Sequence, residues 1–285
     1  MNDMQNKLTK WLFETEAFKV SPGNSPFWYT SGKIGPFYIN THYLYGNASK
    51  AEALLNKIDL LKKDKVALTT MLVEELDKNY AEDAIFSGLI NDMTSFISHK
   101  IDVEEIDYIT GGERRDWFFS ILCAKLLKKP HLTIFKDLSA VEGFRNDIKE
   151  VKNLNGAKCL HIADLITEAS SYERAWIPAI KALNGIMPWT VVVVDRKQGG
   201  MDLLAKANVE AYAMVAVEES LFQMAKSLNY VDADQFKMLM SYSKNPDEAM
   251  KKFIEANPEF IKNAILTDDK SKTRAQLCVE KGFYR

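Results

Sequence analysis

A short stretch of the sequence carries the residue types of a phosphate site. An apolar segment ends at Asp164, and the hydroxyl groups of Thr167, Ser170 and Ser171 lie at the start of an amphipathic segment over residues 170–184. Backbone amides at a helix start, together with hydroxyl groups, commonly bind phosphate. An ordinary helix cap uses the same residue types. The stretch therefore predicts either a phosphate site or a cap.

Cationic side chains follow two other apolar segments. Arg114 and Arg115 come after residues 106–110 and a pair of glycines, and Lys136 comes after residues 131–135. Guanidinium groups bind phosphate and carboxylate groups through paired hydrogen bonds. If the two arginines turn inward near a helix start, they would bind an anion. If they point outward, they would be solvated, and the carboxylates of Glu113 and Asp116 would balance their charges.

A fourth charged segment ends the most apolar part of the chain. Arg196 closes residues 187–196, and Gly199 and Gly200 predict a turn after it. The guanidinium group of Arg196 would hold a planar carboxylate or imide group, or would pair with Asp195. The sequence thus places charged side chains after each of four apolar segments.

Apolar segments that alternate with amphipathic ones predict a mostly parallel β-sheet covered by helices on both faces. The predicted strands are residues 106–110, 131–135, 156–163, 187–196 and 209–217, and the predicted helices around them are residues 4–15, 114–129 and 170–184. Residues 48–100 are also helical in pattern, as is the chain after residue 218, where Asn245-Pro246 and Asn257-Pro258 each predict a helix start. Ligands of such sheets bind at the carboxyl ends of the strands, so we expect the four charged segments to meet there.

The composition indicates a globular chain with no general affinity for nucleic acid. The 285 residues are 47% hydrophobic and 27% charged, with a formal net charge of −2, so an anion site must be a local cluster. The three cysteines lack paired spacing, which favours buried thiols over disulfides or a zinc site. The N-terminal segment is interrupted by acids, unlike a signal peptide, and no apolar run reaches the ~20 residues that span a bilayer. We therefore expect a cytoplasmic protein that binds neither nucleic acid nor membrane.

Three segments resemble the type I phosphoribosyltransferases, and among them orotate phosphoribosyltransferase. These segments are LFETEAFKVSPGNSPFWYTSGKIGPFYIN (12–40), CLHIADLITEASS (159–171) and VVVVDRKQGG (191–200). The resemblance covers residues 8–45 and 104–225. It implies an α/β phosphoribosyltransferase-like domain over residues 1–225, with residues 46–100 largely helical and partly an insertion. A helical C-terminal extension, residues 226–285, is expected to pack on it.

The resemblance also implies a reaction and a role for each motif. Ribose 5-phosphate would pass from phosphoribosyl pyrophosphate to orotate in a homodimeric enzyme, with Mg²⁺ carried mainly by the pyrophosphate substrate and within reach of Asp164. The implied catalytic residues are Asp164, Lys136 and Arg115. The implied phosphate-binding residues are Thr167, Glu168, Ala169, Ser170 and Ser171. The implied pyrophosphate-binding residues are Arg114, Arg115 and Lys136, and the implied base-binding residues are Lys33, Phe37, Tyr38 and Arg196.

Several positions depart from the family pattern. Ala163 stands where the family has the first of two acids, and Glu168 and Ala169 replace small residues, often threonine and glycine. A glutamate that pointed into the phosphate turn would repel the ligand. Residues 135–142 correspond to a mobile catalytic loop but lack its second lysine and its histidine. Two alternatives to orotate transfer therefore stay open: transfer to another base, or a catalytically weakened protein that senses a phosphoribosyl ligand or serves in an assembly.

Overall fold

The computed structural model describes residues 2–22, 25–144 and 147–284, which form two compact units. The first unit comprises Met1–Ala17 and Asn40–Val217, and the second comprises Phe18–Ile39 and Glu218–Arg285. The second unit thus joins an N-terminal segment to the C-terminal helices. From the sequence alone, we had assigned that N-terminal segment to the larger domain and placed the boundary after residue 225.

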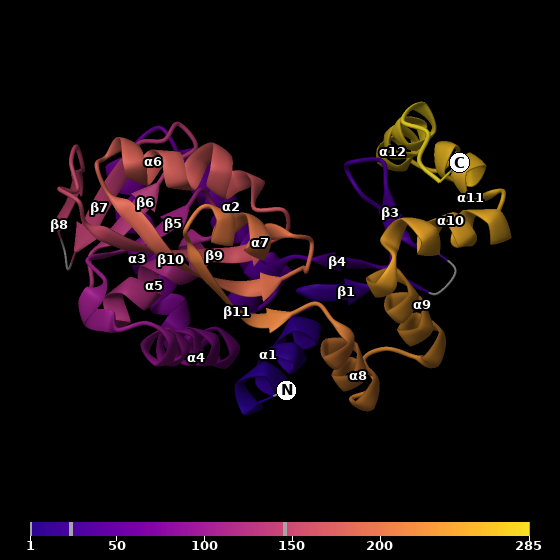
Figure 1. Ribbon diagram of the computed structural model, residues 1–285, viewed down its shortest axis with the longest axis horizontal. Helices are drawn as coiled ribbons and strands as arrows, with labels where there is room; N and C mark the ends of the chain where they lie inside the picture. The colour runs from indigo at the N-terminus through magenta and orange to yellow at the C-terminus, as the bar shows by residue number, and fades with distance from the viewer. Residues whose placement is uncertain (1, 23–24, 145–146, 285) are drawn as a thin grey trace. The chain divides into compact units, whose positions relative to one another are not determined.

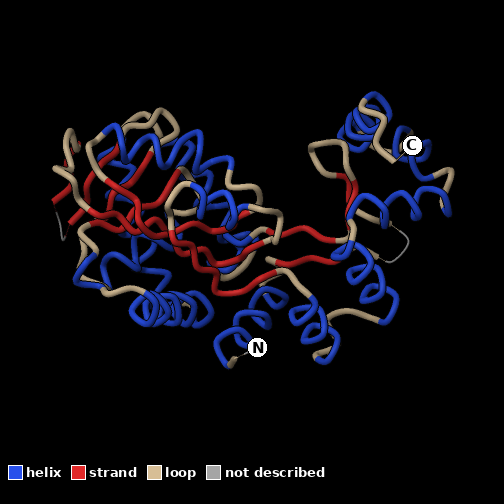
Figure 2. Tube along the Cα trace, viewed as in Figure 1, coloured by secondary structure: helices blue, strands red, loops and turns tan. Residues whose placement is uncertain are grey.

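A seven-stranded sheet forms the centre of the first unit in the described part of the chain, with the order β11-β10-β9-β5-β6-β7-β8 (Figure 2). The strands are β5 (Tyr108–Gly112), β6 (His131–Ile134), β7 (Ala140–Phe144), β8 (Asp147–Glu150), β9 (Lys158–Ile166), β10 (Ile186–Asp195) and β11 (Glu210–Ala216). Strands β11 to β6 pair in parallel, whereas β7 and β8 pair antiparallel at one edge. The predicted mostly parallel sheet is confirmed. The segment expected to be a mobile loop, residues 135–142, instead leads into β7.

The connections between the parallel strands run in opposite directions from the middle of the sheet. Helix α5 (Trp117–Leu126) leads from β5 to β6, whereas α6 (Ile177–Ala182) and α7 (Gly200–Lys206) lead from β9 through β10 to β11. Figure 1 shows α5 and α6 on opposite faces of the sheet. The direction changes between the adjacent strands β5 and β9, and ligands bind where such a change opens a crevice at the carboxyl ends.

The central strands and α5 are apolar because protein covers them on all sides. Val191, Val192, Val193 and Val194 of β10 have no exposed surface. Every residue of α5 from Trp117 to Ala124 is buried. Burial on both faces explains why this strand and this helix lack the polar residues of a solvent-facing element.

Residues 48–100 form three helices, as their apolar spacing predicted. These helices are α2 (Ala48–Leu61), α3 (Lys65–Glu82) and α4 (Ala84–Lys100). The side chains of Asn47, Asp64 and Asp83 accept hydrogen bonds from amides of their first turns, as N-caps do. Helix α1 (Asp3–Glu14) and the short helices η1 (Thr41–Tyr45) and η2 (Val103–Glu105) complete this part of the unit.

The second unit combines four short strands with five helices in the described residues. They are β1 (Phe18–Val20), β2 (Phe27–Trp28), β3 (Ile34–Gly35), β4 (Phe37–Ile39), α8 (Glu219–Ser227), α9 (Ala233–Lys244), α10 (Pro246–Ala256), α11 (Phe260–Ile265) and α12 (Asp269–Glu280). Ring contacts link the strands to the helices: Trp28 stacks on Phe260 with centroids 5.5 Å apart. The described part of the whole chain contains no helix that is both long and apolar enough to cross a membrane.

Several element boundaries differ from the sequence prediction. The strand expected to end at residue 163 runs on to Ile166, so Asp164 lies within β9 and not after it. The helix expected from residue 114 begins at Trp117, and the helix expected over 170–184 starts with a π-helical turn, η3 (Tyr172–Trp176), before α6. Asn245 caps α10 as predicted, but Asn257 does not start a helix. It instead follows the last turn of α10, where its side-chain Nδ2 donates to the carbonyl of Phe253 and its backbone amide donates to the carbonyl of Ile254. The three cysteines are buried free thiols, as expected.

Candidate functional site

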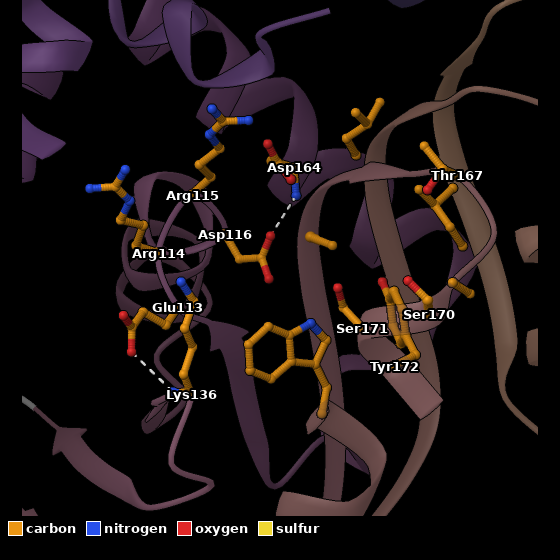
Figure 3. Close-up of a pocket in the computed structure, with 15 residues that line it drawn as sticks. Glu113, Arg114, Arg115, Asp116, Lys136, Asp164, Thr167, Ser170, Ser171 and Tyr172 are labelled. Atoms are coloured by element: carbon orange, nitrogen blue, oxygen red, sulfur yellow. Dashed lines mark hydrogen bonds between the residues drawn. The ribbon is translucent and has the colours of Figure 1, made fainter. Parts of the chain in front are cut away.

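A cavity of about 290 Å³ lies at the carboxyl ends of β5, β6 and β9, within the first unit (Figure 3). It brings together most of the residues singled out from the sequence: Arg114, Arg115, Lys136, Asp164, Thr167, Ala169, Ser170 and Ser171. Two other residues of the charged segments, Glu168 and Arg196, are not part of the cavity wall that the described residues form. Three of the four charged segments therefore meet in one place, as the strand-end argument predicted.

The turn from Thr167 to Ser171, here called the phosphate turn, leaves its donors open. Across the described chain, no protein group accepts a hydrogen bond from the backbone amides of residues 168–171 or bonds to the hydroxyls of Thr167 and Ser171. Ala169 adopts a left-handed backbone with φ +57°. A left-handed residue in such a turn directs successive amides toward one side, which favours an anion there.

Neighbouring backbone holds the phosphate turn in place. The amide of Gly200 donates to the carbonyl of Thr167 at 2.9 Å, and the amide of Arg196 donates to the carbonyl of Ile166 at 3.0 Å. A Cβ atom on Gly200 would lie 2.5 Å from the Thr167 carbonyl oxygen. Glycine is required there because the two segments approach so closely.

Glu168 does not fill the phosphate turn. Its side chain is exposed, and in the described structure it is not part of the cavity wall. The repulsion considered from the sequence requires a carboxylate inside the turn, and this one lies outside it. The hydroxyl of Ser170, by contrast, already has a partner, because Arg174 Nη2 donates to it at 3.2 Å.

Two carboxyl groups lie in the middle of the cavity. Asp164 follows the buried part of β9, and Asp116 comes from the turn before α5. Asp116 Oδ1 accepts a hydrogen bond from the Asp164 amide at 3.0 Å (Figure 3). Burial and then the nearby charge of Asp116 raise the pKa of Asp164 to about 8, while Arg115 acts in the opposite direction.

Cationic groups form the wall opposite the phosphate turn. Arg115 lines the cavity, and none of the described carboxylates lies within ion-pair distance of it. Arg114 is already engaged, because its guanidinium group pairs with Asp59 of α2. Lys136 is exposed at the rim, and its amide donates to Glu113 Oε2 at 3.0 Å. Arg115 and Lys136 are therefore the cations available to a ligand.

The positive character of this wall also affects a buried histidine. The pKa of His42 is lowered to about 3, first by burial and then by the charges of Arg115 and Arg114. A neutral imidazole at this position adds no positive charge of its own.

The residues assigned to the base belong to two different parts of the chain. Lys33, Phe37 and Tyr38 lie in the second unit, where Lys33 Nζ is 2.8 Å from Asp247 and Phe37 stacks on Phe18 with centroids 5.0 Å apart. The Tyr38 hydroxyl donates to the carbonyl of Trp28. Arg196 lies half-buried at the end of β10 in the first unit. Their contact with a base remains a proposal.

The donor set fits a magnesium ion held mainly by a substrate. No group of three or more histidine, cysteine or acidic side chains in the described residues is arranged to hold a metal by itself. Asp164 nevertheless offers a carboxyl group in the cavity, which Mg²⁺ would bind in its deprotonated form. Mg²⁺ prefers one or two carboxylates together with substrate phosphate oxygens, and this arrangement provides that.

Sequence reasoning missed several groups that shape the cavity. Asp116 was read only as a charge that balances the arginines, and Tyr172 and Trp176 were read as part of a helix, yet all three line the cavity. Gly112 is the signal that could have revealed Trp176, since a Cβ there would lie 2.3 Å from the indole ring. A glycine pair after a strand indicates that something large packs against the backbone.

Comparison with known proteins identifies the fold. The sequence matches no family model and no curated protein. The structure is similar to orotate phosphoribosyltransferase from Francisella tularensis, with a TM-score of 0.54 and 14% identity over 82% of this chain and 96% of that one. It is also similar to UMP synthase from Leishmania donovani, with a TM-score of 0.55 and 16% identity over 82% of this chain, which spans 41% of that longer protein. The chain therefore has the fold of the orotate phosphoribosyltransferases, as its three sequence motifs had predicted.

Proposed function

We propose that the chain binds phosphoribosyl pyrophosphate in this cavity and transfers ribose 5-phosphate to a nucleobase, with orotate as the first candidate. The supporting observation is the open phosphate turn, which faces Arg115 and Lys136 across a cavity that holds Asp164 (Figure 3). The substrate carries a phosphate at one end of a sugar and a pyrophosphate at the other. Two anion sites with a carboxylate between them match that distribution of charge.

Each group then has a defined task. The amides of the phosphate turn and the hydroxyls of Thr167 and Ser171 bind the 5-phosphate. Asp164 accepts a hydrogen bond from the sugar, and Arg115 and Lys136 neutralise the negative charge that builds up on the departing pyrophosphate. Bound Mg²⁺ would supply further neutralisation at the same oxygens. Arg196 is the proposed partner of the orotate carboxylate.

A second candidate function is binding without turnover. Two observations favour it: Arg114 is held by Asp59, and Ala163, which lines the cavity, provides no carboxylate. Removing one group that stabilises a transition state lowers the rate by about 10²–10³-fold. A protein with these changes would keep the sugar phosphate site and lose most of its catalysis.

One experiment separates the two functions. Purified protein is mixed with phosphoribosyl pyrophosphate, Mg²⁺ and either orotate or another nucleobase. Loss of orotate absorbance is followed in the first mixture, and pyrophosphate release is followed in all of them. Orotate consumption supports the transferase, and pyrophosphate release with another base supports a different acceptor. A thermal shift with phosphoribosyl pyrophosphate alone, without turnover of any base, supports the binding protein. No shift and no turnover would refute the ligand site itself.

Variants test the assigned roles. Thr167→Val and Ser171→Ala remove the free hydroxyls of the phosphate turn and are expected to weaken binding of phosphoribosyl pyrophosphate. Ser220→Ala serves as a matched control, because that hydroxyl is exposed in the second unit and bonds only to Glu218 among the described residues. If all three variants bound the ligand equally well, the phosphate turn would not be the binding site.

A further inference from the structure

We propose that Asp116 is a second sugar-binding carboxylate, which accepts hydrogen bonds from the ring hydroxyls of the substrate together with Asp164. The inference rests on the proposed function, since it requires a sugar phosphate in the cavity. It assigns a sugar contact to the turn before α5. Ala163, which stands where the resembled family has the first of two acids, has no acceptor in its side chain to make that contact.

The position of Asp116 is set by two backbone donors. Its Oδ1 accepts from the amide of Asp164 at 3.0 Å, and its Oδ2 accepts from the amide of Gly112 at 3.1 Å. The side chain is 10% exposed and lines the same cavity as Asp164. Figure 3 shows the Asp116 carboxylate beside Asp164, with the hydrogen bond from the Asp164 amide drawn between them.

Asp116 does not act as a helix cap. It precedes α5 directly, yet its side chain makes no capping bond to the helix amides. It turns instead toward β9, where His161 Nε2 lies 3.5 Å from Oδ2, and His161 Nδ1 is in turn 2.8 Å from the Thr110 hydroxyl. A residue whose orientation is fixed by two backbone amides is suited to present its remaining acceptor position to a ligand.

The chemistry favours a hydroxylated ligand for this pair. A carboxylate oxygen has two acceptor positions, so each oxygen of Asp116 keeps one after its backbone bond is made. The Asp164 carboxyl group also hydrogen-bonds to the Asp116 side chain, which leaves one position for a sugar hydroxyl. Sugar hydroxyls are donors, and bonds from them to a charged, largely buried acceptor are among the stronger ones. Glu113, the third acid that lines the cavity, accepts a hydrogen bond from the backbone amide of Lys136.

The test uses ribose 5-phosphate and its 2-deoxy and 3-deoxy analogues as probes, with binding measured by titration calorimetry. The wild-type protein is expected to bind ribose 5-phosphate about tenfold or more tightly than at least one deoxy analogue. Asp116→Asn is expected to reduce that preference to less than about threefold for one of the analogues. Asp147→Asn is the matched control: it makes the same change of charge at an exposed position of β8 outside the cavity, and should leave the preference intact.

The outcomes separate this inference from the proposed function. If wild-type protein binds none of the three sugars, the proposed function fails and the inference fails with it. If wild-type protein binds ribose 5-phosphate but Asp116→Asn keeps the full preference, only the role of Asp116 is refuted. Should Asp116→Asn not fold, as judged by circular dichroism, Asp116→Ser is used, because its hydroxyl retains an acceptor for the Gly112 amide while removing the carboxylate.

Discussion

A single methyl group added at Gly200 should disturb the phosphate turn by pressing on its backbone at Thr167. In Gly200→Ala the new Cβ would lie 2.5 Å from the Thr167 carbonyl oxygen and 2.6 Å from Ile166 Cγ1, so one of these groups must move. Overpacking of this kind costs about 1–3 kcal/mol. For a chain of this size, each kcal/mol corresponds to a decrease of about 2–4 °C in Tm.

Gly199 provides a matched control one residue away. A Cβ there meets no atom within 4 Å, but its φ of +91° is unfavourable for alanine. Gly199→Ala is therefore expected to lose about 1–2 kcal/mol of stability through backbone strain alone. Both variants should melt earlier than wild-type protein in differential scanning fluorimetry.

The two variants should differ in ligand binding. Because Gly200→Ala displaces the carbonyl of Thr167, we expect weaker binding of inorganic phosphate and ribose 5-phosphate by calorimetry, whereas Gly199→Ala should retain the wild-type affinity. If Gly200→Ala melted and bound phosphate like the wild-type protein, the phosphate turn would not depend on this contact. If both variants lost binding equally, the loss would come from backbone strain in the turn that contains Gly199 and Gly200, and not from contact with the Thr167 carbonyl.

Three further predictions concern charges in and around the cavity. Arg115→Ala should lower kcat/KM for orotate consumption by about 10²-fold or more, and Arg114→Ala should lower it less, because Asp59 already neutralises Arg114; the opposite order would contradict the assignment. Because the pKa of Asp164 is raised in the folded state, the wild-type protein should lose stability as the pH rises from about 4 to 8. The Asp164→Asn variant should lose less stability over this range, and urea unfolding midpoints at pH 5 and pH 8.5 measure the difference. Glu168→Gln should change phosphate affinity by no more than about twofold, since this exposed side chain lies outside the cavity, and a larger change in calorimetry would place its charge inside.

The five parallel strands were predictable because they carry apolar runs, whereas the antiparallel strands β7 and β8 were missed because their residues are largely exposed or only partly buried. The four valines of residues 191–194 in β10 have no exposed surface. Their continuous apolar run shows no helical spacing that would have made the strand prediction ambiguous. The charged residues after these strands were equally predictable as a group, since parallel strands bring their carboxyl ends to one edge. The sequence therefore predicted that these charged segments meet, and three of the four do line one cavity.

The position of Asp116 in the cavity could not be deduced in the same way. Its hydrogen-bond partner Asp164 is 48 residues away on β9, the strand that also places His161 Nε2 3.5 Å from Asp116 Oδ2. Local pattern favoured a helix that began at residue 114, but Asp116 bonds to the amides of Gly112 and Asp164, and α5 begins only after it. Tertiary hydrogen bonds of this kind leave no periodic signal in the sequence.

The division into two units was also beyond sequence patterns. Residues 18–39 are rich in proline, glycine and aromatic side chains, which predict loops and short strands but not the helices they pack on. Their contacts are ring contacts with distant helices, such as Trp28 on Phe260 and Phe37 on Tyr242. Such pairs become visible only when residues separated by about two hundred positions are placed together.

Trp176 gives the cavity an intrinsic optical reporter. Its indole ring is 6% exposed, lines the cavity and packs against the backbone of Gly112. An anion or a sugar that enters would change the polarity around this ring and hence its fluorescence emission. The chain has five tryptophans, so the difference between wild-type protein and Trp176→Phe isolates this one. Occupancy could then be followed in a stopped-flow instrument with unlabelled protein and with ligands that absorb no visible light.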